Sequence, residues 1–208
     1  MPVNTEVIDA TSIRPMRDEI FVKLKARQDK IGSVYIPDDV ENQQQYATVL
    51  AVGPGEPVAE GERLKPKLQV GDEILIAFKW ERNFEHYGLE GYATVRDVDV
   101  IGKRLEDGSL ELLYNQVSVL PDKVEEKHGL LYIPQSVARE KKTGVVVTGT
   151  VVDVGPGHRL KDGTIKPLDV TIGDKVLYSP FAGEQHSLEE NGAKLQLLPE
   201  EHIVAVLA

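Results

Sequence analysis

The sequence predicts an all-β protein made of two tandem, small antiparallel β-barrels, and three observations support this prediction. Most apolar residues fall in short, β-branched runs that end at glycine, proline or a charged residue. No segment keeps a helical period over three turns, and residues 136–142 are the only short helix candidate. Two motifs, Gly-x-x-Tyr-Ile-Pro and Val-Gly-Pro-Gly, each occur twice, which indicates a tandem duplication.

The repeats divide the chain into two modules of similar length. The first motif occupies residues 32–37 and 129–134, and the second occupies residues 52–55 and 154–157. The copies are 97 residues apart at the first motif and 102 apart at the second, so the second copy carries about five extra residues in one segment. Length variation of this kind is typical of a surface loop. We therefore expect a module at residues 11–105, a second module at residues 109–208, and a variable loop beside each Tyr-Ile-Pro.

The expected strands follow the same order in both modules. They cover residues 19–24, 47–52, 73–77 and 98–101 in the first module, and residues 117–120, 145–154, 175–178 and 203–207 in the second. Asp162 and Gly163 form a typical hairpin-turn sequence. Only residues 106–108 separate the two modules, a reach of about 10 Å, so the modules are expected to be immediate neighbours.

The composition excludes several classes of protein. The 208 residues include no cysteine, which excludes disulfides, thiolate nucleophiles and cysteine-ligated zinc. The formal net charge is -10 and the basic residues are scattered, which argues against nucleic-acid binding. Residues 1–10 contain neither an apolar signal-peptide region nor an Arg-rich amphipathic pattern, and no long apolar segment follows. We expect a soluble intracellular protein, or one whose targeting peptide has been removed.

Candidate metal and catalytic residues do not form a recognisable site. The histidines are dispersed without the spacing of metal ligands: His86, His128, His158, His186 and His202. Both Gly-Pro-Gly segments lack the Lys-Ser/Thr pair and the following helix of a phosphate loop. No nucleophile-elbow sequence is present. We expect no metal, no cofactor and no enzymatic activity.

Three segments resemble one known family. Residues 13–23 (Ile-Arg-Pro-Met-Arg-Asp-Glu-Ile-Phe-Val-Lys), followed after eight residues by residues 32–36, look like the opening signature of the GroES family, the co-chaperonins that cap chaperonin chambers. Met16 and Glu19 depart from the signature, because the family usually has a smaller aliphatic and a basic residue there. Residues 154–174 closely resemble the family's roof hairpin and the strand that follows it. The tandem layout is similar to that of the plastid double co-chaperonin.

The resemblance implies a GroES-like barrel in each module, with a mobile loop and a roof hairpin. In this family the mobile loop inserts an apolar tripeptide into a groove between two helices of the chaperonin's apical domain. The matching positions here are Val34, Tyr35, Ile36, Leu131, Tyr132 and Ile133. Without the resemblance, such apolar runs are more often buried strand residues. The charged and amide-rich residues on both sides of each run favour the loop interpretation.

The implied function is a ring-shaped lid on an ATP-bound, GroEL-type chaperonin that assists protein folding. Burying three side chains gives about 5–9 kcal/mol, and ordering the loop costs about 1–2 kcal/mol per residue. A single loop therefore binds weakly, and a ring of loops binds tightly.

We expect a ring of three or four chains, as a homo-oligomer or mixed with single-module co-chaperonins. Residues 98–101 and 203–207 are expected to close the ring by pairing with a neighbouring module's first strand. The alternative function is a structural or scaffold ring former that has the same barrel and does not bind a chaperonin. The expected compartment is the cytoplasm of a bacterium or a phage-infected host, or the plastid stroma.

Overall fold

The computed structural model describes residues 8–25, 30–31, 34–35, 45–58, 61–76, 82–122, 127–128, 131–132, 146–179, 186–190 and 193–207. The regular structure of these residues consists of β-strands and short 3₁₀ turns, with no α-helix among them. The predicted all-β fold class is therefore confirmed. As far as the described residues form them, the large sheets are open and do not close into barrels. The helix candidate at residues 136–142 lies outside the described residues.

The chain forms two compact units. Unit 1 contains residues 1–116 together with residues 155–168, and unit 2 contains residues 117–154 and 169–208. The units differ from the sequence repeats in two places, because the opening of the second repeat, residues 109–116, and one of its hairpins both lie in unit 1. This hairpin pairs β16 (His158–Arg159) with β17 (Ile165–Lys166), and it belongs to the second repeat but to unit 1.

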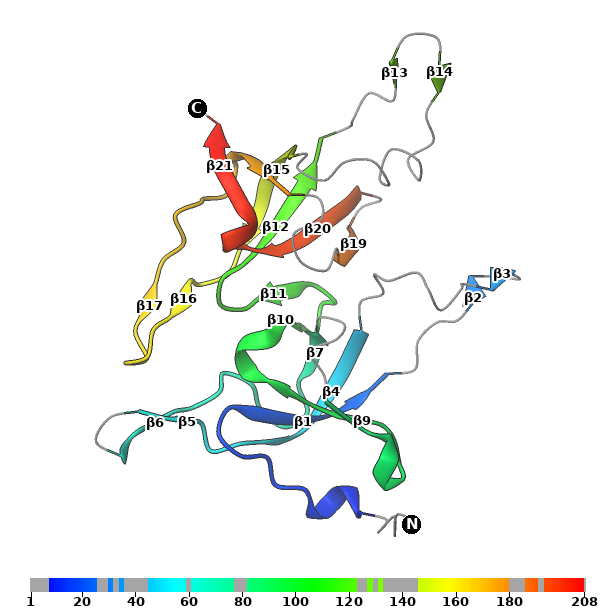
Figure 1. The fold of residues 1–208 in the computed structure, drawn as a ribbon, viewed down its shortest axis with the longest axis vertical. Helices are drawn as coiled ribbons and strands as arrows, with labels where there is room; N and C mark the ends of the chain where they lie inside the picture. Colours follow the sequence, from blue (N-terminus) through cyan, green and yellow to red (C-terminus); the bar gives the residue numbers. More distant parts are fainter. Residues whose placement is uncertain are drawn as a thin grey trace, which may run out of the picture. The chain divides into compact units, whose positions relative to one another are not determined.

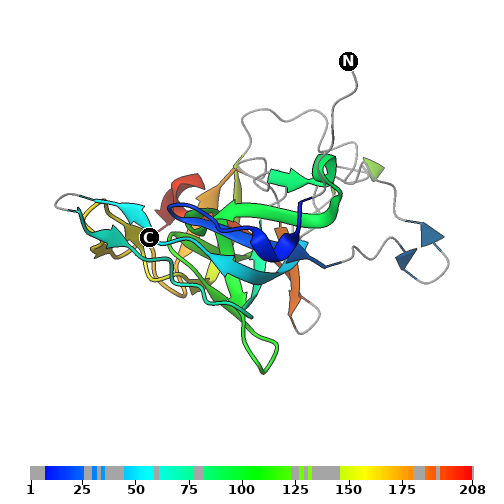
Figure 2. The same cartoon turned by 90° about the horizontal axis from the view of Figure 1, so that it is seen from below.

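Unit 1 is built on a seven-stranded sheet with the strand order β11-β10-β7-β4-β1-β9-β8 (Figure 1). Its strands are β1 (Glu19–Leu24), β4 (Gln45–Val52), β7 (Glu73–Ile76), β8 (Arg82–Phe84), β9 (Leu89–Arg96), β10 (Val100–Arg104) and β11 (Leu110–Leu112). Its 3₁₀ turns are η1 (Ala10–Ser12), η3 (Glu85–Tyr87) and η4 (Asp97–Asp99). The hairpins β5–β6 (Glu56–Pro57 and Arg63–Leu64) and β16–β17 lie beside each other, in cyan and yellow in Figure 2. A Cβ added to Gly163 would lie 2.7 Å from Leu64 Cδ2.

The core of unit 1 lies on one face of this sheet, because alternate residues of a strand point to the same side. Ile20 and Val22 of β1 enter the core. Phe21 points to the opposite face, where the ring centroids of Phe84 and Tyr92 each lie 5.7 Å from its own. The buried core cluster consists of Ile20, Val22, Ala47, Val49, Leu68, Ile74, Ile76, Ala93, Val95, Val100, Leu113 and Tyr114. The last two come from the opening of the second repeat, which therefore completes the core of unit 1.

Unit 2 is built on a six-stranded sheet with the strand order β19-β20-β12-β15-β18-β21. Its elements are β12 (Gln116–Pro121), β15 (Val147–Val154), β18 (Lys175–Tyr178), β19 (His186–Glu190), β20 (Ala193–Pro199), η5 (Glu200–His202) and β21 (Ile203–Leu207). Its buried apolar residues include Val117, Val119, Val151, Val170, Val176, Tyr178, Leu195, Leu197 and Leu198. Burial, with a smaller effect of the Asp122 charge, raises the pKa of Tyr178 to about 12.

The two repeats fold alike even where their strands are irregular. A β-bulge at Leu50 interrupts the β1–β4 register, and a bulge at the equivalent Val152 interrupts the β12–β15 register. The repeated Val-Gly-Asp and Ile-Gly-Asp sequences form the same turn. The side chains of Asp72 and Asp174 each accept a hydrogen bond at 2.8 Å from the backbone N–H three residues earlier.

The repeated Val-Gly-Pro-Gly motif hydrogen-bonds to the backbone at the start of each module's first long strand, β1 or β12. The glycine N–H groups donate from Gly53 to Glu19 O (2.9 Å), from Gly55 to Arg17 O (2.8 Å), from Gly155 to Gln116 O (2.8 Å) and from Gly157 to Tyr114 O (3.0 Å). A Cβ on Gly53 or Gly155 would lie 2.3 Å from the carbonyl oxygen of Arg17 or Tyr114, so only glycine permits this approach. Arg17 and Tyr114 also share a positive φ, of 55° and 51°. The repeats therefore hold these two residues in the same backbone conformation.

Candidate functional site

The two apolar runs singled out in the sequence each contribute to a short antiparallel hairpin (Figure 1). In the first repeat β2 (Lys30–Ile31) pairs with β3 (Val34–Tyr35), and in the second β13 (Lys127–His128) pairs with β14 (Leu131–Tyr132). The registers are equivalent: Lys30 is opposite Tyr35, and Lys127 is opposite Tyr132. Each hairpin is a separate two-stranded sheet and belongs to neither large sheet.

The structure places the predicted site residues as follows. Val34 and Tyr35 form β3, and Leu131 and Tyr132 form β14. Ile36 and Ile133 lie outside the described residues. Each hairpin begins at the same sequence distance after the preceding long strand, β1 or β12. The two repeats thus present the same backbone element twice.

A second candidate site is the junction between the repeats, where β10 of the first repeat pairs with β11 of the second. The register is Gly102 opposite Leu112, Lys103 opposite Glu111 and Arg104 opposite Leu110. Leu113 N–H continues the ladder by donating to Ile101 O at 3.0 Å. Within the chain, β10 therefore pairs with the opening segment of the second module and not with the first strand predicted for that module at residues 117–120. The strand itself begins at Val100, because residues 97–99 form the turn η4.

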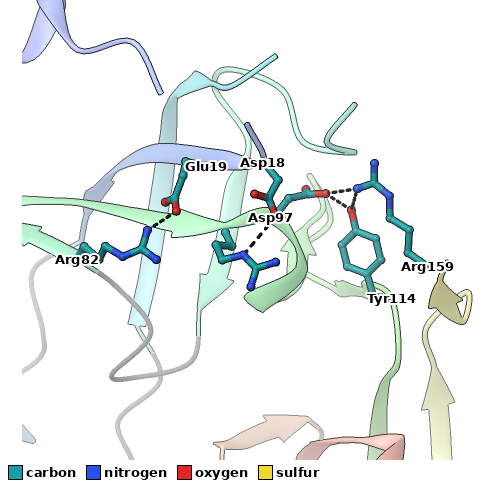
Figure 3. A network of polar contacts seen from close by, with 7 residues as sticks. Asp18, Glu19, Arg82, Asp97, Tyr114 and Arg159 are labelled. Carbon is teal, nitrogen blue, oxygen red and sulfur yellow. Dashed lines mark hydrogen bonds and ion pairs between the residues drawn. The ribbon is translucent and has the colours of Figure 1, made fainter. Parts of the chain in front are cut away.

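A buried polar cluster fixes this junction (Figure 3). Asp97 of η4 is fully buried, and its Oδ2 accepts hydrogen bonds from the Tyr114 hydroxyl and from Arg159 Nη1, the latter at 2.9 Å. Arg159 Nη1 also donates to Tyr114 Oη at 3.2 Å, and Arg159 Nη2 donates to Lys65 O at 2.9 Å. The Lys67 Nζ lies 5.3 Å from the centroid of the Tyr114 ring. One network therefore joins η4, the opening of the second repeat and β16.

Burial and charge act in opposite directions on Asp97. Burial raises the pKa of Asp97, whereas the Tyr114 hydroxyl and the Arg159 guanidinium lower it. Burial, and then the neighbouring Asp97 carboxylate, raise the pKa of Tyr114 well above its ordinary value. Tyr114 therefore remains a hydrogen-bond donor, and Arg159 supplies the charge that balances Asp97.

The sequence patterns do not predict this cluster. Its members are separated by 17 and 45 residues, and they belong to different repeats. One signal in the sequence could have revealed it. Tyr114 of the second repeat is equivalent to Arg17 of the first, so the two repeats have different residue types at this position.

Within the described part of the chain, no group of three or more His, Cys, Asp or Glu side chains is arranged to hold a metal ion. None of the helices described there has the length and apolar character needed to cross a membrane.

The chain is similar to known proteins over both of its repeats. The family described as Chaperonin 10 Kd subunit matches the chain twice, at residues 12–104 and 109–207. The chain is 27% identical over 201 residues to the 20 kDa chaperonin, chloroplastic, of Arabidopsis thaliana, a match that covers 95% of this chain and 77% of the relative. It is 29% identical over 202 residues to the protein of the same name from Spinacia oleracea, with 95% and 76% covered.

A single repeat matches shorter relatives. The Co-chaperonin GroES of Gemmatimonas aurantiaca is 41% identical over 96 residues, which cover 46% of this chain and 91% of the relative. The predicted resemblance to a tandem co-chaperonin is confirmed by these matches together with the two family matches. The chain therefore belongs to the Chaperonin 10 Kd subunit family and carries two copies of its module in tandem.

Proposed function

We propose that this protein forms a ring-shaped lid on an ATP-bound, GroEL-type chaperonin and assists protein folding by binding its apical domains. Membership of the family supports a co-chaperonin role. The observation that carries the proposal is the pair of equivalent hairpins, β2–β3 and β13–β14, which lie outside the large sheets. The proposed contact residues are Val34, Tyr35, Ile36, Leu131, Tyr132 and Ile133.

A lid needs several loops on one assembly, because each loop alone binds weakly. Three apolar side chains contribute about 5–9 kcal/mol, and most of this is offset by the ordering of the loop. Loops held on one ring raise the effective concentration of each further contact. Weak individual loops also allow the lid to leave when the chaperonin changes state.

The protein is proposed to act without enzymatic activity or a cofactor, since a lid functions by binding. Two compartments are compatible with its relatives. One is the plastid stroma, supported by the chloroplastic proteins of Arabidopsis thaliana and Spinacia oleracea. The other is the cytoplasm of a bacterium or a phage-infected host, supported by the GroES proteins.

We expect native mass spectrometry to show an assembly of three or four chains, which presents six or eight modules in one ring. A mixed ring would incorporate single-module co-chaperonins when these are added. An assembly of seven chains would instead indicate that one module of each chain lies outside the ring. A monomer at micromolar concentration would contradict the ring and favour a different role for the fold.

A further inference from the structure

Each repeat carries an ion pair at the root of its candidate loop, where the chain leaves the large sheet, and the charges of the two pairs are reversed. In the first repeat, Lys25 follows β1 directly, and its Nζ lies 2.6 Å from Glu73 Oε2 of β7. In the second repeat, Asp122 follows β12 directly, and its Oδ1 lies 2.5 Å from Lys175 Nζ of β18. The root residue is therefore the cation in the first repeat and the anion in the second.

The two ion pairs occupy equivalent positions. Glu73 and Lys175 each come directly after the repeated Gly-Asp turn and begin β7 and β18. Each root residue donates its backbone N–H to the strand by which the chain returns to the sheet, from Lys25 to Tyr46 O (2.8 Å) and from Asp122 to Thr148 O (3.0 Å). This returning strand, β4 or β15, lies between the other two strands in its sheet. Each ion pair therefore crosses the returning strand, and we call the two pairs the root clamps.

The reversal indicates that the attraction itself is what the two repeats share. A change of one member alone would place two like charges together, so a reversed pair requires a change on both strands. The side chains also differ in length, because aspartate stands in the second repeat where lysine stands in the first. The shared property is therefore opposite charge across the returning strand, and not the packing of a particular side chain.

Further contacts tie each root clamp to the returning strand. Glu73 Oε1 also accepts from Arg104 Nη1 at 3.0 Å, and Arg104 Cζ lies 5.4 Å from the centroid of the Tyr46 ring. Thr148, which is equivalent to Tyr46, donates from Oγ1 to Asp122 Oδ2. In both repeats the clamp therefore joins the strand that leaves, the strand that returns and the strand beyond it.

The root clamps are charged at neutral pH but too exposed to hold a whole unit together. The neighbouring lysine, Lys25 or Lys175, lowers the pKa of Glu73 or Asp122, respectively. The four side chains are 26% to 47% exposed, and ion pairs of this exposure contribute little to global stability. A weak contact can still decide whether the root stays on its sheet, because a local opening costs far less free energy than global unfolding.

We propose that the root clamps position the two chaperonin-binding loops. A clamped root keeps its hydrogen bond to the returning strand and leaves the sheet in a fixed direction. An open root adds residues that must be ordered when the loop binds, and this ordering weakens binding. The four clamp residues are therefore positioning residues, which act through the loops. This inference rests on the proposed function and adds the residues that set the affinity of each loop.

The second clamp is tested without a chaperonin, by hydrogen exchange of backbone N–H groups. In Lys175→Glu two carboxylates meet at the root, and the protection factor of the Asp122 N–H should fall about five- to tenfold. The double variant Asp122→Lys/Lys175→Glu places the first repeat's pair in the second repeat and should restore protection at residue 122. The Gly155 N–H, which donates to Gln116 O at the other end of β12, is the reference and should keep its protection. Equal losses at the two N–H groups, or no loss at residue 122, would overturn the clamp.

The first clamp is tested in the same way. Glu73→Gln removes the carboxylate that pairs with Lys25, and the protection factor of the Lys25 N–H should fall about three- to fivefold. Lys103→Gln is the matched control, because it breaks an ion pair in the same sheet, with Asp72 at 2.8 Å, that includes no root residue. It should leave the Lys25 N–H unchanged. A loss in Lys103→Gln as large as that in Glu73→Gln would overturn the clamp at this root.

The positioning role is tested by capture of the assembled protein on an immobilised GroEL-type chaperonin with ATP. Glu73→Gln/Lys175→Glu, which breaks both clamps, should weaken capture about tenfold. Asp122→Lys/Lys175→Glu, which keeps both clamps, should bind like the unmodified protein. Unchanged capture by the variant without clamps would overturn the positioning role alone. No capture by the unmodified protein would overturn the proposed function together with the positioning role.

Discussion

Replacing Tyr35 and Ile36 with serine, or Tyr132 and Ile133 with serine, is expected to weaken capture of a GroEL-type chaperonin by about 100-fold or more. Each pair removes two of the three apolar side chains of a loop, and each side chain is worth about 1.5–3 kcal/mol when buried. A loss of 1.4 kcal/mol corresponds to a factor of about ten in affinity. Replacing all four residues should abolish capture, because no loop would then contribute to the multivalent contact. The measurement is binding of the assembled protein to immobilised chaperonin in the presence of ATP.

A matched control removes apolar surface elsewhere. Val70 and Ile172 are 67% and 63% exposed at equivalent turns of the two repeats, so Val70→Ser/Ile172→Ser deletes two exposed apolar side chains outside the loops. This control should bind like the unmodified protein. The loop variants should keep their circular dichroism and thermal midpoint, because β3 and β14 belong to neither large sheet. Cooperative loss of folding in the loop variants would mean that the apolar runs are core strands.

Arg159→Ala is expected to destabilise unit 1 by about 3–5 kcal/mol, because it leaves a buried carboxylate without its counter-charge. Asp97 is fully buried, and the Arg159 side chain is only 11% exposed. For a unit of this size the loss corresponds to a fall of about 10–20 °C in its thermal midpoint. Arg82→Ala is the matched control, since Arg82 also pairs with one carboxylate, that of Glu19, but is 65% exposed. It should cost less than about 1 kcal/mol, and calorimetry of both variants makes the comparison.

The effect of Arg159→Ala should also depend on pH. Without the guanidinium, the pKa of Asp97 rises further above its value in the unfolded chain, which is about 3.9. A raised pKa of an acid in the folded state contributes stability below the unfolded value and loses it as the pH rises through the folded value. The difference in stability between the variant and the unmodified protein should therefore be smaller at pH 4 than at pH 7. A difference that is constant with pH would contradict the role of Arg159 as the counter-charge of Asp97.

Four strands of each module could be predicted, because short β-branched runs and their stop signals are local properties. The long strands β9 (Leu89–Arg96) and β20 (Ala193–Pro199) were not among the expected strands. Equivalent turns such as Val-Gly-Asp were visible as repeats, and the structure explains them by the hydrogen bonds that Asp72 and Asp174 accept. The strand predicted at residues 98–101 lies at Val100–Arg104 instead, because Asp97–Asp99 form the 3₁₀ turn η4, in which Asp97 is buried. The apolar periodicity of the sequence could not predict whether the sheets close into barrels. Closure depends on whether edge strands such as β8 and β11 find partners.

The division of the chain into compact units depends on contacts between distant residues. The hairpin β16–β17 lies in unit 1 through Arg159, which reaches a carboxylate 62 residues away and a carbonyl 94 residues away. Neither separation follows from the repeat pattern, which groups this hairpin with the rest of the second repeat. For the loops, the sequence indicated the tripeptides and their equal spacing. The pairing of Val34 with Ile31 and of Leu131 with His128 emerged only from the structure.

The most direct test of the central claim is negative-stain electron microscopy of the protein mixed with a GroEL-type chaperonin. With ATP present, we expect a cap of density over one or both ends of the chaperonin cylinder, and without nucleotide we expect bare ends. The variant with serine at positions 35, 36, 132 and 133 should leave the ends bare in both conditions. Bare ends with ATP at saturating concentrations of the unmodified protein, or caps that persist in the four-serine variant, would contradict the proposed lid.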